Sequence, residues 1–98
     1  MAKRSIKDLK QFDMADYLES PEDVADYLNI ALEEGDGDAL VQALGTVARA
    51  HGMAEIAAAA EVGRESLYKA LREGAQPRFQ TVQKVLAALG LQLHVTAA

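Results

Sequence analysis

Residues 53–73, which read MAEIAAAAEVGRESLYKALRE, decide the fold of this chain. They predict two helices of about nine and ten residues, joined by the very short turn Glu61-Val62-Gly63. Ala57 stands where two such helices would cross, and its small side chain permits a close approach there. Apolar residues recur at spacings that bury one face of each helix: Ile56, Ala60, Val62, Leu67 and Ala70. The segment is typical of a helix-turn-helix, whose second helix enters the major groove of DNA.

The second of these helices carries polar side chains at the positions that its apolar face leaves exposed. Arg64 and Glu65 stand in its first turn, which reaches base edges in this motif; arginine pairs with guanine, and glutamate accepts from cytosine. Lys69 and Arg72 lie further along, where contacts to phosphate are expected. Tyr68 is placed to stack on a sugar or to donate to a phosphate. The alternative is a solvated helix face, on which Arg64 pairs with Tyr68 at i, i+4. Glu65 and Lys69 then form an ion pair at the same spacing.

Start and stop signals place two helices before this segment. Ser20 is a predicted N-cap with Pro21 at the first helical position, and Gly35 ends that helix. Asp36 or Asp38 can cap the next helix, which stops near residue 52.

The C-terminal part is predicted to hold one more helix and a strand. The helix runs from about Phe79 to Leu89, with Gly90 as its stop signal. Residues 91–95 alternate between apolar and polar with period two, which predicts a short strand. A lone strand must pair, and its cheapest partner is its own copy in a dimer. We therefore expect an all-α, repressor-like bundle of about five helices with a helical N-terminal extension and one short C-terminal strand.

Composition narrows the function classes. The chain has 98 residues with a formal net charge of −5, no cysteine and half of its residues apolar. The lack of cysteine excludes disulfides and thiolate metal sites, and His51 and His94 lack the spacing of zinc ligands. No apolar run approaches the roughly 18 residues that span a bilayer, and no signal peptide is recognisable. No nucleophile grouping or glycine-rich phosphate loop is present. We expect a soluble, cytoplasmic protein that is not an enzyme and needs no metal or cofactor.

Charge divides the chain into two halves. Residues 1–40 carry four basic and eleven acidic side chains, a balance of −7, whereas residues 41–98 carry six basic and four acidic ones, a balance of +2. The acidic half repels nucleic acid and attracts basic partners, and the other half tolerates phosphate. The acidic half also contains a repeat, because residues 13–18 (DMADYL) return as residues 23–28 (DVADYL). The two Tyr-Leu pairs are either core anchors or part of a partner-binding surface.

Several blocks of the chain resemble one family. They are ALGTVARAHGM at residues 43–53, RESLYKAL at 64–71, QPRFQTV at 76–82 and ALGL at 88–91, with further similarity at 12–18 and 27–36. Together they closely resemble the addiction-module antidote proteins, HigA-like antitoxins of the phage-repressor (XRE-type) helix-turn-helix class, over residues 12–93. The resemblance implies a bicistronic toxin–antitoxin system in the bacterial cytoplasm. It implies a small basic toxin of the RelE/ParE-like fold and a homodimer that represses their shared operon.

The resemblance also implies a division of labour along the chain. Residues 1–37 are expected to form an acidic helical extension, and residues 38–98 an XRE-type DNA-binding domain. By analogy with repressor loops, Gln76 and Arg78 join the expected contacts to operator DNA. The predicted DNA-binding residues are Arg64, Glu65, Ser66, Tyr68, Lys69, Arg72, Gln76 and Arg78. A toxin that grips RNA is basic, so the acidic region is the candidate toxin surface. The predicted toxin-binding residues are Asp16, Tyr17, Glu22, Asp23, Asp26 and Tyr27.

The chain departs from the repressor pattern at three positions. Met53 replaces the usual glutamine, Glu61 replaces a glycine and must accept a left-handed conformation, and Gly63 replaces a serine cap. Gly45, inside a predicted helix, indicates close packing against another helix. Two other function classes stay open: a stand-alone, phage-like repressor without a toxin, and a protein-interaction module with a degenerate helix-turn-helix.

Overall fold

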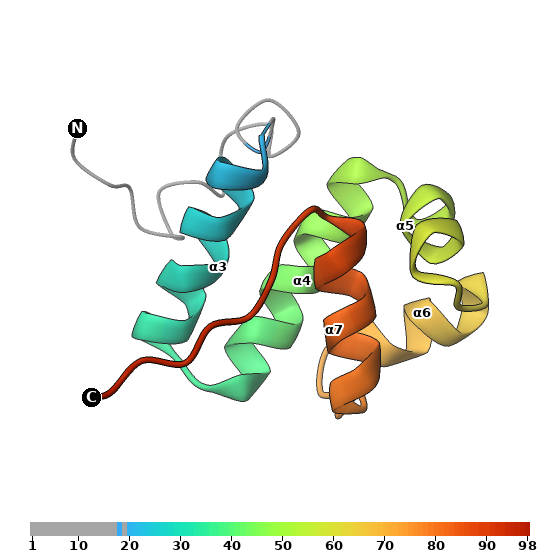
Figure 1. The fold of residues 1–98 in the computed structure, drawn as a ribbon. Coiled ribbons are helices and arrows are strands. Elements are labelled where there is room, and N and C mark those ends of the chain that lie inside the picture. Colours follow the sequence, from blue (N-terminus) through green and yellow to red (C-terminus); the bar gives the residue numbers. More distant parts are fainter. Residues whose placement is uncertain (1–17, 19) are drawn as a thin grey trace.

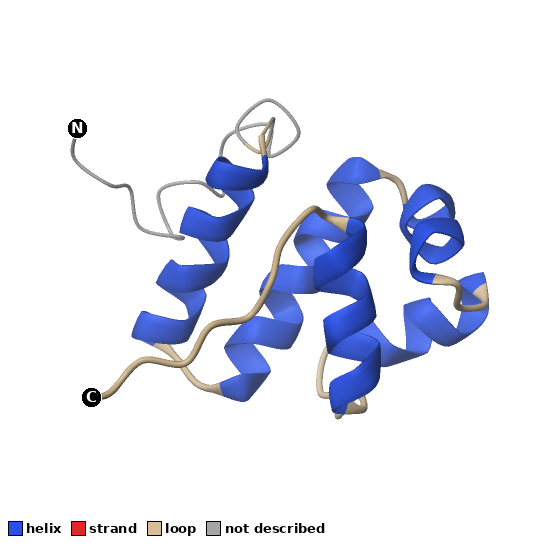
Figure 2. Cartoon of the chain, in the orientation of Figure 1, coloured by secondary structure: helices blue, strands red, loops and turns tan. Residues whose placement is uncertain are grey.

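The computed structural model describes Leu18 and residues 20–98, and five helices make up this part of the chain (Figure 1). They are α3 (Pro21–Glu34), α4 (Gly37–His51), α5 (Met53–Ala60), α6 (Arg64–Leu71) and α7 (Phe79–Ala88). Figure 2 shows that the regular structure of the described residues is entirely helical. The predicted all-α class is therefore confirmed, and no helix in the described part is long and apolar enough to cross a membrane.

Local capping interactions explain where the first two of these helices begin. The backbone N–H of Asp23 donates to the Ser20 hydroxyl at 3.1 Å, and Pro21 occupies the first turn, where it needs no hydrogen-bond partner. At the start of α4, the Asp36 carboxylate accepts from the N–H groups of Asp38 and Ala39 at 3.0 and 3.3 Å. Of the two predicted caps, Asp36 is thus the one that is used.

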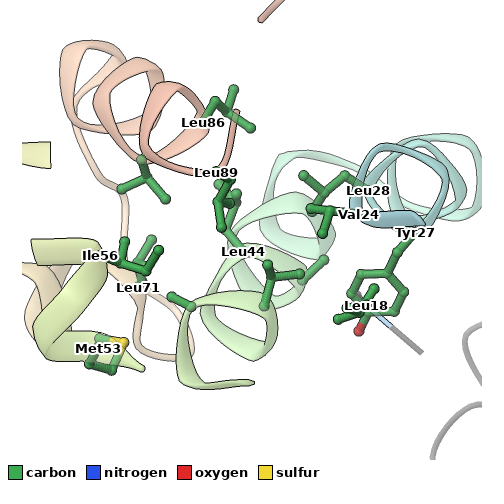
Figure 3. Close-up of a cluster of buried hydrophobic side chains, with 14 of the residues drawn as sticks. Leu18, Val24, Tyr27, Leu28, Leu44, Met53, Ile56, Leu71, Leu86 and Leu89 are labelled. Atoms are coloured by element: carbon green, nitrogen blue, oxygen red, sulfur yellow. The ribbon is translucent and has the colours of Figure 1, made fainter. Parts of the chain in front are cut away.

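One hydrophobic core joins all five helices around α4. Leu44 is completely buried and lies at the centre of Figure 3, between Val24 and Leu28 of α3 on one side and Ile56 and Leu71 on the other. Side chains of α7 close the core from a third direction. Because α3 shares this core, it is held against α4 by the same apolar burial that holds the C-terminal helices together.

The predicted C-terminal strand is wrong. Residues 91–98 form no strand; the chain leaves α7 through Gly90, and the Leu91 N–H donates to the Leu86 carbonyl at 2.8 Å. Leu91 is partly buried against the core, whereas Leu93 and Val95 are 46% and 98% exposed. A strand needs a neighbouring strand for its backbone hydrogen bonds, and the elements around this segment are all helices. The alternating segment therefore has no strand to pair with within the described part of one chain.

Candidate nucleic-acid interface

The connection between α5 and α6 is a three-residue turn with a left-handed residue. Glu61 has φ 58° and ψ 43°, which confirms the conformation predicted for it. The N–H of Val62 donates to the Ala57 carbonyl at 3.0 Å, so the end of α5 is closed by a backbone hydrogen bond. Gly63 then adopts an extended conformation as the N-cap of α6. The chain changes direction at this turn without a glycine at the left-handed position.

Two features hold α6 against α4. Leu67 and Leu71 point into the core and are 0% and 2% exposed. In addition, a Cβ atom placed on Gly45 would lie 2.8 Å from the backbone carbonyl oxygen of Leu71, so the two helices touch backbone to backbone. The close packing predicted at Gly45 is confirmed. Because a backbone contact cannot shift as a flexible side chain does, this contact fixes where α6 lies.

The outer face of α6 and the following loop present the whole predicted DNA-binding set to solvent. Exposed side chains are found at all eight positions, namely Arg64, Glu65, Ser66, Tyr68, Lys69, Arg72, Gln76 and Arg78. The guanidinium carbon of Arg64 lies 5.7 Å from the centre of the Tyr68 ring, so the i, i+4 pair that the alternative of a solvated helix face predicts is present. A contact between the face of the Arg64 guanidinium and the ring leaves the N–H donors, which lie in the guanidinium plane, available to other groups.

The predicted toxin-binding residues divide into three groups. Glu22 and Asp26 are exposed on α3 and Asp23 is half-buried. Tyr27 is 4% exposed and belongs to the core, so its side chain contributes nothing to the surface of the described structure. Asp16 and Tyr17 lie outside the described residues.

Tyr27 links α3 to α4 through a polar contact that sequence reasoning missed. Its hydroxyl group lies near the Thr46 side chain and the Arg49 guanidinium, both of which act on its pKa. Burial raises the pKa of Tyr27 above its ordinary value of 10.0, against smaller opposing effects of Thr46 and Arg49. No sequence signal joins positions 27 and 46, because they meet only through the packing of two helices.

Acidic side chains gather at one end of the molecule, whereas the other end carries charges of both signs with a small basic surplus. Residues 20–48 contain seven acidic side chains and no lysine or arginine: Glu22, Asp23, Asp26, Glu33, Glu34, Asp36 and Asp38. These residues belong to α3, to the first turn of α4 and to the connection between them, which lie far from α6 in Figure 1. Five of the six basic side chains after residue 48 follow the turn before α6: Arg64, Lys69, Arg72, Arg78 and Lys84. Within the described residues no group of three histidine or carboxylate side chains is placed to hold a metal ion.

Comparison with known proteins gives a matching family and a similar sequence. The model of the family described as "Probable addiction module antidote protein" matches residues 8–97. A protein of Haemophilus influenzae (strain ATCC 51907 / DSM 11121 / KW20 / Rd), described as uncharacterized, is 47% identical over 87 residues. These residues cover 89% of this chain and 90% of the relative. No solved structure matches the chain.

Proposed function

This chain belongs to the family of probable addiction module antidote proteins, and from that premise we propose that it is the antitoxin of a type II toxin–antitoxin system. It neutralises a small basic toxin of the RelE/ParE-like fold by direct binding in the bacterial cytoplasm. It also represses the operon of both genes as a DNA-binding homodimer of the HigA-like, XRE-type class. Both roles are those of a binding protein, and neither requires catalysis.

The observation that carries the DNA-binding part is the exposed face of α6. A short left-handed turn at Glu61 sets α6 across α5, and Leu67, Leu71 and Gly45 fix it in that position. This arrangement supports a helix-turn-helix in which α6 is the recognition helix. Arg64, in its first turn, reads a guanine, while Lys69 and Arg72 neutralise phosphates. In a two-fold dimer the two α6 helices meet half-sites about one helical turn apart.

The toxin-binding part is supported by the charge distribution. The helix α3 and its connection to α4 bear only acidic charges, and this end of the molecule is far from α6 in Figure 1. An acidic surface attracts a basic protein and repels DNA, so the two partners bind separate ends of the chain. We assign toxin recognition to residues 1–37 and DNA recognition to residues 38–98. Asp16, Glu22, Asp23 and Asp26 supply the charge.

Co-purification tests the toxin-binding part. The chain is tagged and expressed together with the genes that flank it, and the complex is washed at high salt. We expect a stoichiometric small basic protein that is toxic when expressed alone. Changing Glu22, Asp23 and Asp26 to their amides weakens capture, and a chain that purifies alone as a dimer supports the stand-alone repressor instead.

DNA binding is tested with the promoter fragment upstream of the gene and a shuffled fragment of equal length. We expect Arg64→Ala to reduce the preference for the promoter by about 1–3 kcal/mol. Lys84→Ala removes the same charge from α7 and is the matched control, with a small and equal loss on both fragments. Unchanged discrimination by the Arg64 variant contradicts the assignment of α6 as the recognition helix.

A further inference from the structure

An apolar groove lies at the acidic end of the molecule, between α3, α4 and the end of α7. It encloses about 100 Å³, and its apolar lining consists of Ala25, Leu28, Leu32, Leu40, Leu86 and Leu91. The polar side chains of Asn29 and Gln92 complete the wall. The start of α3 and the end of α7 meet beside it, because a Cβ atom on Gly90 would lie 3.5 Å from Pro21 Cγ.

The size of the groove indicates what kind of group it accepts. Sites for small molecules enclose about 300–1,000 Å³, several times more than this groove. An apolar space of about 150 Å³ is enough for one benzene molecule, so this groove holds roughly one aliphatic side chain. It is therefore suited to a single anchoring residue of a protein partner.

The groove lies along the edge of the face that α3 buries against the core. Val24, Tyr27 and Ala31 of that face are buried against α4. On α3 the groove is lined by Ala25, Leu28, Asn29 and Leu32, which follow the i, i+3, i+4, i+7 spacing of one helix face. Leu28, at 4% exposure, is shared with the core. Leu32, at the open end of the groove, is 46% exposed.

The charge around the groove selects its occupant. Glu22 and Asp26 are exposed on α3, Glu33 stands next to Leu32, and no lysine or arginine occurs between residues 20 and 48. A second copy of this chain would bring two such acidic helices together, which like-charge repulsion opposes. A partner whose apolar anchor is flanked by lysine or arginine gains both apolar burial and charge attraction.

We propose that this groove receives an apolar anchor side chain from a lysine- or arginine-rich segment of the toxin. The inference rests on the proposed antitoxin function and names the contact that function uses. The anchor packs between Leu32 of α3 and Leu86 of α7, and Asn29 and Gln92 hydrogen-bond the backbone of the docked segment. The acidic side chains of α3 face the basic residues that flank the anchor.

The test measures the affinity of purified variants for the small basic protein that co-purifies with the wild-type chain. We expect Leu32→Ala, which removes a wall of the anchor site at the open end of the groove, to raise Kd about tenfold. Leu32→Lys adds repulsion and raises Kd further, whereas Leu32→Met keeps the volume and retains binding. Phe79→Ala is the matched control, because Phe79 is an exposed apolar residue, 63% accessible, at the far end of α7. All four variants are checked for an unchanged thermal unfolding midpoint.

The possible outcomes separate this inference from the proposed function. If the wild-type chain captures its basic partner and both Leu32→Ala and Leu32→Lys bind it equally well, the groove is not the docking site and the antitoxin function stands. If Leu32→Lys converts a dimer to a monomer without weakening capture, the groove is an interface between copies and the inference is overturned. If the wild-type chain binds no basic partner, the proposed function fails and the inference fails with it.

Discussion

Gly45 and Leu71 are in direct contact, with 2.8 Å between the position of a Cβ atom on Gly45 and the carbonyl oxygen of Leu71. The contact joins the middle of α4 to the last residue of α6. Any side chain at position 45 must push the two helices apart. The placement of the proposed recognition helix therefore depends on a glycine that lies outside it in the sequence.

Gly45→Ala is expected to destabilise the protein, although alanine favours a helix over glycine by about 1 kcal/mol. The added methyl group meets backbone, and overpacking of this kind costs about 1–3 kcal/mol. Urea unfolding measures the net loss. Gly37→Ala, in the same helix, is the control. Nothing lies within 4 Å of the Cβ position of residue 37, so this variant is expected to be neutral or stabilising. Equal stability of the two variants contradicts the backbone contact.

Glu61→Gly is expected to stabilise the protein by up to about 1 kcal/mol, because glycine adopts the left-handed conformation without steric cost. The thermal midpoint should rise. Glu55→Gly removes the same side chain from the first turn of α5, where glycine is unfavourable, and should lower the midpoint. A lower midpoint for Glu61→Gly is incompatible with strain at that turn.

Tyr68→Ala is expected to weaken promoter binding about two- to fivefold, since the ring that orients Arg64 contributes roughly 0.5–1 kcal/mol at an exposed site. Tyr68→Phe keeps the ring and retains most of that effect. Fluorescence anisotropy with the promoter fragment distinguishes the two. If the phenylalanine variant loses as much affinity as the alanine variant, the hydroxyl group and not the ring is the important part.

Tyr27→Phe is expected to cost about 1 kcal/mol of unfolding free energy, because it removes the polar contact of the hydroxyl group with Thr46 and Arg49. The raised pKa of Tyr27 adds a pH dependence. The folded state holds the phenolic proton more tightly than the unfolded state. The stabilisation by the protonated Tyr27 side chain is therefore fully present below pH 10.0, its ordinary pKa, and is lost as the pH rises through the raised pKa.

Unfolding of the wild type and of Tyr27→Phe between pH 8 and pH 11, compared by subtraction, isolates this contribution from those of other titrating groups. The difference between the two proteins should shrink as the pH rises. A difference that stays constant over the whole range contradicts a buried, neutral Tyr27.

The sequence by itself determined the local features of this protein. The helix boundaries follow from Ser20, Asp36 and the glycines at helix ends, and the left-handed Glu61 follows from the glycine that the repressor pattern has at this position. These features depend on residues within a few positions of one another, so the rules of helix capping and turn geometry are sufficient to predict them. The exposed face of α6 also followed from spacing alone.

Only the tertiary structure decided which surfaces are used. It buried Tyr27 against Thr46 and left residues 91–98 without a strand. It also left Leu32 of α3 46% exposed at the open end of a groove beside the end of α7. Periodicity shows that a face is apolar or that a segment alternates, but not which neighbour covers it. That depends on contacts between residues far apart in the chain, which are fixed only when the five helices of the described part pack into one core.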